Sequence, residues 1–571
     1  MTESALSSEP NSELSKDLSA ASRSVLLAQS IVDQSLSGLK KACTEQGKFN
    51  TALLDNHQWV SYDLARFSAE ISAASNMLAY AARARLERDD PDETLLEEKL
   101  ALTYCAEMYA SVRAGMAPRL ADFQVSSESF TRAFDTPELL TWMASYSSTA
   151  KLQALGKEIQ DSQGYLGDSQ LDSAHESMSD NFLRFAKEVV DPMAEHIHRF
   201  DTDIPNDIIE PLANMGVFGL SVKEQFGGLQ SDEGEDNLGM IVVTEALSTG
   251  SLCAAGSLIT RPEILSKALM AGGTEEQQRY WLPRVASGET LSAIAVTEPD
   301  YGSDVAGVRL PATRTDGGWL LNGSKTWCTF CGRANLIVVL ARTNPDLSAG
   351  HKGLSVFLVE KPAFEGHEFK HVQEKAGGAV SGRAIPTIGY RGMHSFEVFF
   401  DNYFVPDANL VGGESGLGQG FYTIMRGFSG GRIQTAARAI GIMQAAFQKA
   451  LSYSADRKVF GQAVGDYQLT QVKLARMGLL LAVCRQFTYA VGRLLDQGEG
   501  QMEASLVKVF ACKVSEWVTR EALQIHGGMG YSEETAVSRY YVDSRVLSIF
   551  EGAEETLALK VIARSLIENA K

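Results

Sequence analysis

The sequence predicts an α+β protein that is mostly α-helical, and its 571 residues are enough for roughly four folding units of about 150 residues each. Two observations predict this class. Runs with helical spacing fill both ends of the chain, and a block of short β-rich runs separated by Gly, Asp and Asn lies between them. Because helices, strands and helices follow one another in blocks, a doubly wound βαβ chain is excluded.

The N-terminal segment 1–160 is expected to be a helical extension. Arg66–Glu87 carries an apolar stripe at helical spacing, and Leu95–Val112 resumes the pattern after the break DDPDET. The Gly-, Ser- and Asp-rich segment 161–175 then predicts a linker.

Three further units are expected after the linker. Segment 176–290 is again mostly helical, and 291–410 is predicted to be an antiparallel β domain from the runs LSAIAV, GWLLNG, NLIVVLA, LSVFLVE and SFEVFF. Segment 411–571 is expected to be a helical bundle. Its long helices are predicted at Gly420–Arg457, Tyr467–Gln497, Gln501–His526 and Glu554–Ala570.

One internal repeat links the two helical ends of the chain. His57–Arg83 can be laid on Tyr467–Arg493 without a gap, and Lys99 and Lys508 coincide after a shift of one residue. The matching pairs are Gln58/Gln468, Leu64/Leu474, Ala65/Ala475, Arg66/Arg476 and Arg83/Arg493. The repeat favours an extension that is a degenerate copy of the C-terminal bundle. The alternative is that two amphipathic helices share a pattern by chance.

Composition excludes several classes of protein. Lys and Arg total 52 and Asp and Glu total 71, so the formal charge is −19, a field that repels nucleic acid and anionic lipid. No window of 18 apolar residues predicts a membrane span, and the polar, acidic start resembles neither a secretory signal nor a transit peptide. Seven cysteines, an odd number, favour a reducing compartment. A cytoplasmic enzyme is therefore expected.

Two segments at the start of the β block can bind a flat, phosphorylated ligand. AVTEPDYGSD ends in Gly302-Ser303-Asp304, whose N–H groups and hydroxyl can hold a phosphate or a flavin edge. In GWLLNGSKTWCTFCGRA, Trp327 and Thr329 are two residues apart and are expected on one face of a strand, suited to a heterocycle. A core Trp in a sheet is the alternative.

The pair Cys328 and Cys331 forms a CxxC, but the chain has no second pair and no His at ligand spacing, so no metal site is predicted there. The pair does not open a helix as a thioredoxin-like motif would. We expect ordinary strand residues.

The last region holds a candidate base. Glu551 follows the apolar Ile549-Phe550 and precedes Gly552, a setting in which a partly desolvated carboxylate can act as a general base. The alternative is a helix-start residue favoured by the dipole. Both interpretations fit the residues equally.

Together these segments resemble the acyl-CoA dehydrogenase family. AVTEPDYGSD, LNGSKTW, GRIQTAARAIG, DRKVFG, QIHGGMGY and IFEG occur in the family's order and spacing over about 176–571. The resemblance implies a helical domain, a central β domain and a C-terminal four-helix bundle that enclose FAD. The N-terminal extension is not typical of the family.

The resemblance also implies roles for particular residues. The flavin and its pyrophosphate would contact Val296, Thr297, Gly302, Ser303, Trp327 and Thr329. The nucleotide end of a neighbouring subunit's FAD would contact Arg457, Phe460, Gln468, Gln524, Gly527 and Gly528. Ala553 and Glu555 occupy positions where the family often has a Thr and a Gln that touch the cofactor.

By the same resemblance, Glu551 takes the α-proton of an acyl-CoA while flavin N5 takes the β-hydride. Some relatives carry the base just before the bundle arginine, but here Gly430 and Gly431 precede Arg432. The implied substrate-binding residues are Ser303, Arg261, Phe428, Ser429, Arg432 and Gly552.

The resemblance of the extension and core together implies a short-chain, branched dicarboxylyl-CoA as substrate. Arg261 is the candidate partner for its second carboxylate, with a surface Arg before a Pro as the alternative. The implied partners are electron-transferring flavoprotein and a second copy of the chain, a dimer being favoured over a tetramer.

Other functions were weighed. A dehydrogenase or oxidase of another short-chain acyl-CoA shares the fold and base. A flavin-bearing, DNA-associated stress protein is disfavoured by the charge of −19, and a non-catalytic assembly factor is disfavoured by the presence of Glu551.

Overall fold

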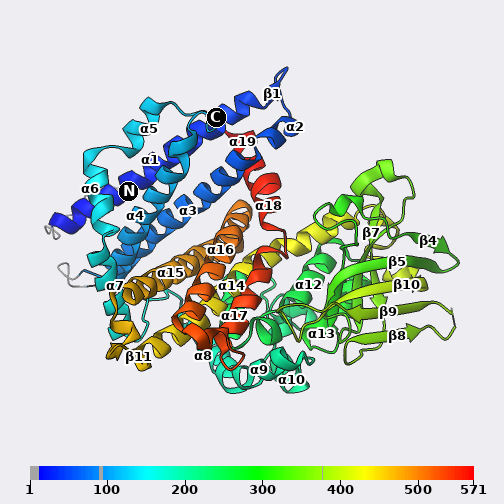
Figure 1. Ribbon diagram of the computed structural model, residues 1–571. Helices are drawn as coiled ribbons and strands as arrows, with labels where there is room; N and C mark the ends of the chain where they lie inside the picture. The colour runs from blue at the N-terminus through cyan, green and yellow to red at the C-terminus, as the bar shows by residue number, and fades with distance from the viewer. Residues whose placement is uncertain (1–11, 89–93, 376) are drawn as a thin grey trace.

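The computed structural model describes residues 12–88, 94–375 and 377–571. It contains a helical extension, a set of shorter helices, a β domain and a long helical bundle, in chain order. The bundle lies in the middle, with the extension on one side and the β domain on the other (Figure 1). Among the described residues, no helix is both long and apolar enough to cross a membrane.

The extension is built from two long helices and several shorter ones. Its elements are α1 (Ser12–Ala42), β1 (Thr44–Glu45), β2 (Lys48–Phe49), α2 (Thr51–Leu54), α3 (Gln58–Leu86), α4 (Leu96–Met116), α5 (Ser127–Phe134), α6 (Pro137–Tyr146) and α7 (Thr149–Asp161). Ser148 caps α7 by accepting a hydrogen bond from the Lys151 N–H. The predicted linker becomes the irregular segment 162–172, which ends where Asp172 caps the next helix.

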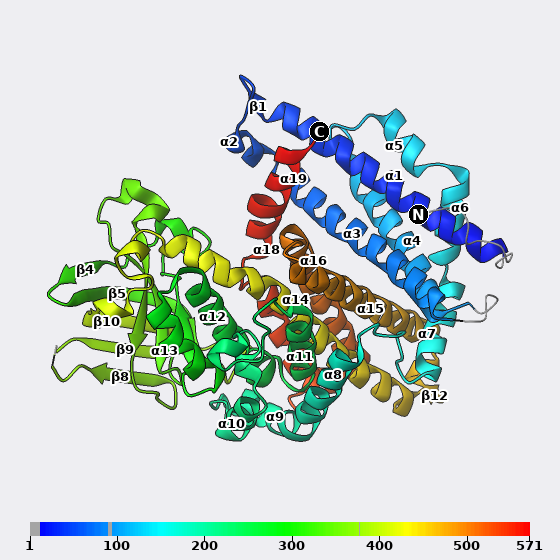
Figure 2. The ribbon, with the colours of Figure 1, turned by 180° about the vertical axis from the view of Figure 1, so that it is seen from behind.

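The shorter helices of the core are α8 (Ser173–Phe185), α9 (Asp191–Phe200), α10 (Asn206–Asn214), α11 (Asn237–Gly250), α12 (Thr260–Gly272) and α13 (Glu275–Ala286). A capping box formed by Thr274 and Gln277 begins α13. Almost every residue of α11 is buried, because α11 lies between α8 and the bundle (Figure 2).

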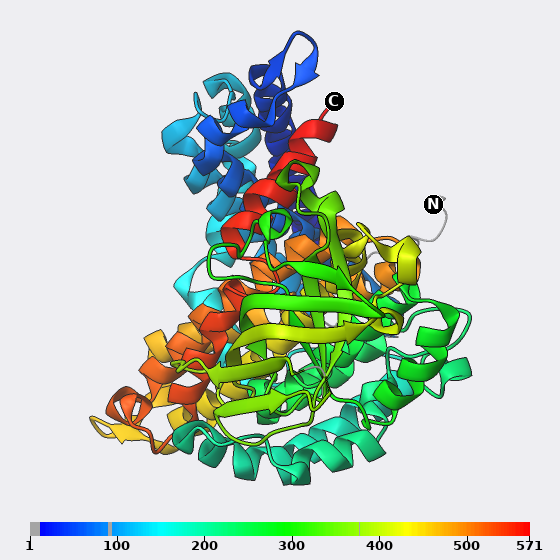
Figure 3. The ribbon, with the colours of Figure 1, turned by 90° about the vertical axis from the view of Figure 1, so that its right-hand side faces the viewer.

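The β domain consists of two sheets. One has the order β4-β5-β10-β9-β8 and the other β3-β6-β7. The strands are β3 (Ser292–Ala295), β4 (Ala312–Thr315), β5 (Gly318–Thr329), β6 (Leu336–Arg342), β7 (Leu354–Glu360), β8 (Glu368–Val372), β9 (Ala379–Ala384) and β10 (Ser395–Pro406). All pairs are antiparallel except β3 with β6, which is parallel. Figure 3 shows the five-stranded sheet in front of the bundle.

The C-terminal bundle follows the predicted helices to within one residue at most ends. Its elements are α14 (Gly420–Asp456), β11 (Lys458–Val459), β12 (Gln462–Ala463), α15 (Gln468–Asp496), α16 (Gln501–Ile525), α17 (Ala536–Arg545), α18 (Glu554–Thr556) and α19 (Arg564–Asn569). A π-helical segment, Leu557–Ala563, joins α18 to α19, where the sequence predicted one continuous helix.

The extension packs against the bundle and the C-terminal tail. A Cβ built on Gly156 of α7 would lie 2.1 Å from the Gln471 carbonyl oxygen, so α7 and α15 approach at backbone distance. Lys560 of the tail pairs with Asp55 at 2.6 Å. The C-terminus therefore lies beside α1 and α3, far along the chain from both (Figure 1).

Candidate active site

Glu551 occupies a kinked connection rather than a helix start. Its φ is 53° and that of Gly552 is 99°, so two successive residues are left-handed. The helix that follows begins at Glu554, and its first-turn acids are Glu554 and Glu555. The helix-start interpretation of Glu551 is therefore wrong. Its Oε2 is buried and has no hydrogen-bond partner among the described residues.

The Glu551 carboxylate faces bare backbone of α14. A Cβ at Gly431 would lie 2.8 Å from Glu551 Oε2. A Cβ at Gly430 would lie 2.0 Å from Glu263 Oε1, which belongs to α12. The two glycines before Arg432 thus leave space for the carboxylates of Glu263 and Glu551. A side chain at Gly430 or Gly431, where some relatives carry the base, would collide with one of these carboxylates.

Lys508 of α16 holds the loop that carries Glu551. Its Nζ donates to the Gly552 carbonyl oxygen at 2.7 Å, and the side chain is fully buried. Burial lowers the pKa of the Lys508 ammonium. The sequence placed Lys508 only in the repeat. A lone Lys within the apolar run Leu506–Phe510 was the signal that could have identified it.

Arg432 lies one residue beyond Gly431 and is half-buried. Its Nη1 donates to Ser505 Oγ at 3.0 Å, and burial lowers the pKa of its guanidinium. Phe428, one helical turn earlier, is also half-buried. The side chain of Ser429 lies outside the described part of the structure.

Two buried arginines lie near Glu551. Arg261 is 7% exposed, and its Nη1 is 3.3 Å from the Ser257 carbonyl oxygen and 3.5 Å from the Tyr390 hydroxyl. The interpretation of Arg261 as a surface residue is therefore wrong. Arg438 is completely buried, and its guanidinium lies 4.7 Å above the ring of Phe550, the residue before Glu551.

Neither guanidinium has a carboxylate partner. Arg438 donates to the Gln434 carbonyl oxygen and to the hydroxyls of Ser257 and Thr435. In the described ranges, no ion pair is formed by Arg261 or Arg438. A buried cation outside an ion pair is costly, and burial lowers the pKa of Arg438, an effect that the charges of Tyr390 and Glu551 oppose. The sequence missed Arg438, because AARAIG reads as one more turn of an amphipathic helix.

Tyr390 gives a role to part of the stretch 374–392. Its hydroxyl faces Arg261, and its ring meets that of Phe550 edge-on with centroids 5.5 Å apart. Its backbone N–H donates to Asp543 Oδ1 at 2.7 Å, which fixes the loop against α17. Tyr390 therefore lies between Arg261 and the residue that precedes Glu551.

The segment Val296–Ser303 is held by a buried ion pair and touches the chain after Glu551. Glu298 accepts hydrogen bonds from Lys325 Nζ at 2.8 Å and from the N–H groups of Arg309 and Leu310. Lys325 also donates to the Val296 carbonyl oxygen, and the Thr297 carbonyl accepts the Thr326 N–H. Thr556 donates to Ser303 Oγ at 3.1 Å. The structure thus brings Ser303 into contact with Thr556, which follows Glu551 by five residues in the chain.

Trp327 lies in a bulge of β5, and Thr329 follows the bulge. The register with β10 shifts between Cys328 and Lys325, and Trp327 has a φ of 58°. Trp327 is 55% exposed, so the core-Trp interpretation is wrong, whereas Thr329 is buried and bonded to Ser395 at 2.9 Å. Gly302 has open space around its missing side chain. An exposed indole, a hydroxyl and an open glycine fit the edge of a flat cofactor.

The residues implied for the nucleotide end lie at the far end of the bundle. Rings of Tyr453 and His526 stack at 4.2 Å, which brings the ends of α14 and α16 together. Arg457, Gln524, Gly527 and Gly528 are exposed there, as are Phe460 and Gln468. Arg457 is 25 residues beyond Arg432, about 38 Å along a helix. The structure does not bring this group together with Trp327 and Glu551 in one chain.

The cysteine pair is buried. Cys328 lies in β5, one residue before its end, and Cys331 lies in the following turn rather than in a strand. Both are fully buried, and burial raises the pKa of the Cys331 thiol to about 12.

The chain belongs to the acyl-CoA dehydrogenase family, whose members are FAD-dependent oxidoreductases. It matches the family's N-terminal domain over residues 172–289, its middle domain over 293–403 and its C-terminal domain over 418–567. These matches begin at the end of the linker and cover the core, the β domain and the bundle.

Individual relatives refine this comparison. The chain is 36% identical to (2S)-methylsuccinyl-CoA dehydrogenase of Cereibacter sphaeroides over 96% of its own length and 98% of that protein. It is 32% identical to a mitochondrial 2-methylacyl-CoA dehydrogenase of Solanum tuberosum over 72% of its length and 95% of that protein. The butyryl-CoA dehydrogenase structure from Megasphaera elsdenii covers 70% of this chain and 100% of its own, with 29% identity and a TM-score of 0.63.

Proposed function

We propose that this enzyme oxidises (2S)-methylsuccinyl-CoA to mesaconyl-CoA (2-methylfumaryl-CoA). One observation carries the proposal: the buried guanidinium groups of Arg261 and Arg438 lie beside Tyr390 and Phe550, the latter next to Glu551 in the chain, and neither forms an ion pair with a described residue. A substrate that brings a second carboxylate compensates that buried charge, whereas a purely aliphatic acyl group does not. The relative from Cereibacter sphaeroides, which matches the extension as well as the core, supports the same substrate.

We propose FAD as the cofactor, held by Gly302, Ser303, Trp327 and Thr329. When bound, FAD supplies the acceptor for the β-hydride. The exposed Trp327 indole provides a stacking surface, and the hydroxyls of Ser303 and Thr329 provide hydrogen bonds. Ala553 and Glu555 lack the hydroxyl and the amide that the family often has at these two positions. Thr556, which donates a hydrogen bond to Ser303, provides a hydroxyl next to them in the chain.

The residues of this chain prepare the removal of the α-proton. Glu551 Oε2 is buried and unpartnered, so it is free to accept that proton. Lys508 fixes the Gly552 carbonyl, which holds the kinked loop in place. Charge-assisted hydrogen bonds from Arg261 and Arg438 to the distal carboxylate then orient the α-carbon toward Glu551.

The enzyme is proposed to work as a dimer that passes electrons to electron-transferring flavoprotein. The nucleotide-end residues are exposed about 38 Å from Arg432 along α14, which supports a cofactor shared with a second subunit. The extension covers faces of α15 and α16, which supports a dimer over a tetramer. A structure described as an electron transferring flavoprotein of Acidaminococcus fermentans matches 71% of this chain at 28% identity, with a TM-score of 0.62.

The test compares two thioesters that differ in one carboxylate. (2S)-Methylsuccinyl-CoA and 2-methylbutyryl-CoA have the same branched skeleton, and anaerobic bleaching of the flavin reports oxidation of either. For Arg438→Met and Arg261→Met, we expect kcat/KM for methylsuccinyl-CoA to fall about 100-fold, because a charged hydrogen bond is lost. Turnover of 2-methylbutyryl-CoA is expected to stay unchanged or rise.

Arg279→Met is the matched control, because Arg279 is exposed and pairs only with Glu275 one turn away on α13. It should leave both substrates unaffected. An equal loss for both thioesters in the buried variants, or no loss for either, would contradict the proposed substrate.

A further inference from the structure

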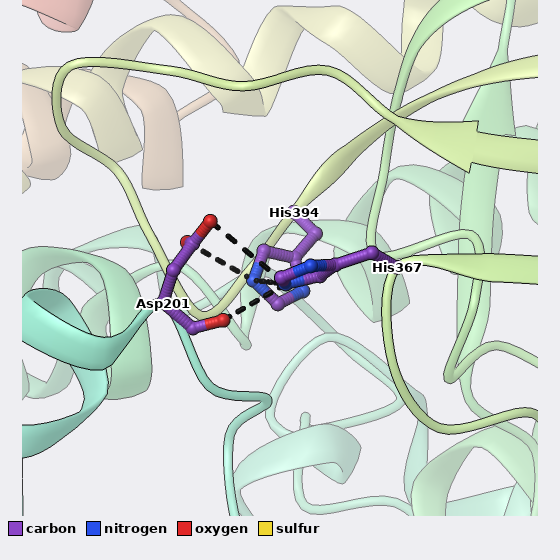
Figure 4. A group of neighbouring side chains, drawn as sticks. All are labelled: Asp201, His367 and His394. Carbon is purple, nitrogen blue, oxygen red and sulfur yellow. Dashed lines mark hydrogen bonds and ion pairs between the residues drawn. The ribbon is translucent and has the colours of Figure 1, made fainter.

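Two histidines and an aspartate from distant parts of the chain meet at the junction of the core helices and the β domain. Asp201 follows α9 with a φ of 52°, His367 immediately precedes β8, and His394 precedes β10 with a φ of 36°. Their side chains converge on one point in Figure 4. None of the three belongs to the candidate active site, and the sequence predicted no metal site.

The distances between their polar atoms are those of ligands around one small cation. His367 Nε2 and His394 Nε2 are 3.2 Å apart, and His394 Nε2 is 3.2 Å from Asp201 Oδ1. Asp201 Oδ2 is 3.8 Å from His367 Nε2. Zn–N and Zn–O bonds of about 2.0–2.1 Å in a tetrahedron place neighbouring ligand atoms roughly 3.3–3.4 Å apart.

Hydrogen bonds alone do not satisfy this cluster. His367 Nε2 is 2.8 Å from the Asp201 backbone oxygen and His394 Nε2 faces Asp201 Oδ1, so each nitrogen needs a proton to bond its oxygen. Both nitrogens would then be donors to these oxygens and would lie 3.2 Å apart with no hydrogen bond between them. If one nitrogen gives up its proton, its lone pair faces an oxygen lone pair instead. A cation that accepts both nitrogen lone pairs removes the conflict.

The surroundings resemble a built metal site. His394 Nδ1 is 3.1 Å from Asp203 Oδ1, and Asp203 Oδ2 also accepts the Gly366 N–H. A carboxylate on the second ring nitrogen fixes the tautomer that presents Nε2 to a metal. His394 is buried, whereas the side chain of His367 is 48% exposed, which leaves solvent access for a water ligand.

We propose that Asp201, His367 and His394 bind one zinc ion that braces the core helices to the β domain. Two imidazoles and one carboxylate suit zinc, while magnesium and calcium prefer oxygen ligands alone. Ser395, next to His394, bonds Thr329, and the Phe330 N–H donates to the His394 carbonyl. The brace therefore secures the strand ends beside Trp327 and Thr329. No chemical step is assigned to it.

The experiment uses the untagged full-length enzyme with its flavin, treated with a chelator and then titrated with zinc alone in a calorimeter. We expect one zinc per chain and a rise in the thermal unfolding midpoint. His367→Ala and His394→Ala should abolish both effects, and Asp203→Asn should weaken binding by about 10–100-fold. Magnesium titrated in the same way should give neither effect.

His371→Ala is the matched control, because it removes a histidine from β8 itself, outside the cluster. It should bind zinc as the wild type does. Because His367 is half-exposed, its alanine variant is expected to fold, and its flavin absorbance checks this. Absence of stoichiometric zinc in the wild type, or equal zinc affinity in His394→Ala and His371→Ala, would overturn the proposal.

Discussion

The extension and the C-terminal bundle follow the same order of elements. Each has a long helix, a hairpin of two-residue strands, a 29-residue helix and a further helix, and α3 and α15 correspond over their whole lengths at an offset of 410 residues. The two hairpin turns agree as well, with left-handed Gln46-Gly47 in one and Phe460-Gly461 in the other. This order is what a degenerate copy predicts; the duplication itself stays a prediction.

The two regions differ in what their polar residues do. Lys508 is fully buried and holds the loop of the candidate base, whereas Lys99 is 38% exposed and pairs with Glu158 at 2.9 Å. Arg83 and Arg493, in contrast, both bond Gln170 of the linker. Helix packing and contacts to the linker are common to both regions. Of the two corresponding lysines, only Lys508 of the bundle contacts the loop that carries Glu551. A shared helical scaffold therefore does not imply shared chemistry.

Among the changes that compare the extension with the bundle, the largest effect is expected from the lysine pair. Lys508→Met leaves the Gly552 carbonyl without its partner in a buried setting, which costs about 1–3 kcal/mol. We expect kcat to fall by roughly 10- to 100-fold with an unchanged flavin content. Lys99→Met, at the corresponding position, should change kcat less than twofold. Steady-state kinetics of both variants check this, and equal effects would show that the two regions do not differ as described.

A smaller effect is expected where the two regions touch. Gly156→Ala introduces a Cβ about 2.1 Å from the Gln471 carbonyl oxygen, so α7 and α15 must separate. Overpacking of this kind destabilises by about 1–3 kcal/mol, which thermal unfolding measures. Lys157→Ala, at the exposed neighbouring position, is the control and should leave the midpoint unchanged. An unaffected Gly156→Ala would argue against a tight contact between the regions.

The smallest effect is expected at the joint between linker and core. His175 faces Asp236 at 3.1 Å and Asp172 at 2.8 Å, and the hydrogen bond to Asp236, followed by that to Asp172, raises the pKa of His175 above 6.5. Because the folded state binds the proton more tightly, this stabilisation is complete below the unfolded pKa of about 6.5 and is lost as the pH rises through the folded pKa.

His175→Gln should therefore be less stable than the wild type at low pH, and the gap should close as the pH rises above about 6.5. Thermal unfolding measured across this range tests the sign. His371 lies in strand β8, whereas His175 lies in helix α8, and His371→Gln should keep the pH dependence of the wild type. A gap that widens with rising pH would contradict the assignment of His175 as a protonated partner of Asp236.

Much of the fold was predictable because long periodic helices carry a strong signal. The long bundle helices α14, α15 and α16 were predicted to within one residue, whereas α17 was not predicted, and α3 was found from Arg66–Glu87, although it begins at Gln58. The π-helical segment Leu557–Ala563 was missed, since a change of helix type leaves the apolar pattern intact. The bulge at Trp327 was missed because a positive φ at a non-glycine residue has no sequence signature.

The candidate site was predictable only in part. Glu551 was found from its apolar neighbours and Gly552, but the buried, unpaired state of Arg438 depends on helices that the sequence does not place in space. Asp201, His367 and His394 were missed for the same reason, because more than 160 residues separate Asp201 from His367.

The central claim is that Glu551 is the base that removes the α-proton, and its amide tests the claim most directly. Glu551→Gln keeps the shape of the side chain but cannot accept the proton, so the account predicts a rate of flavin bleaching by (2S)-methylsuccinyl-CoA about 10²- to 10⁴-fold below that of the wild type, with the yellow cofactor retained. A yellow variant that bleaches at the wild-type rate would contradict it.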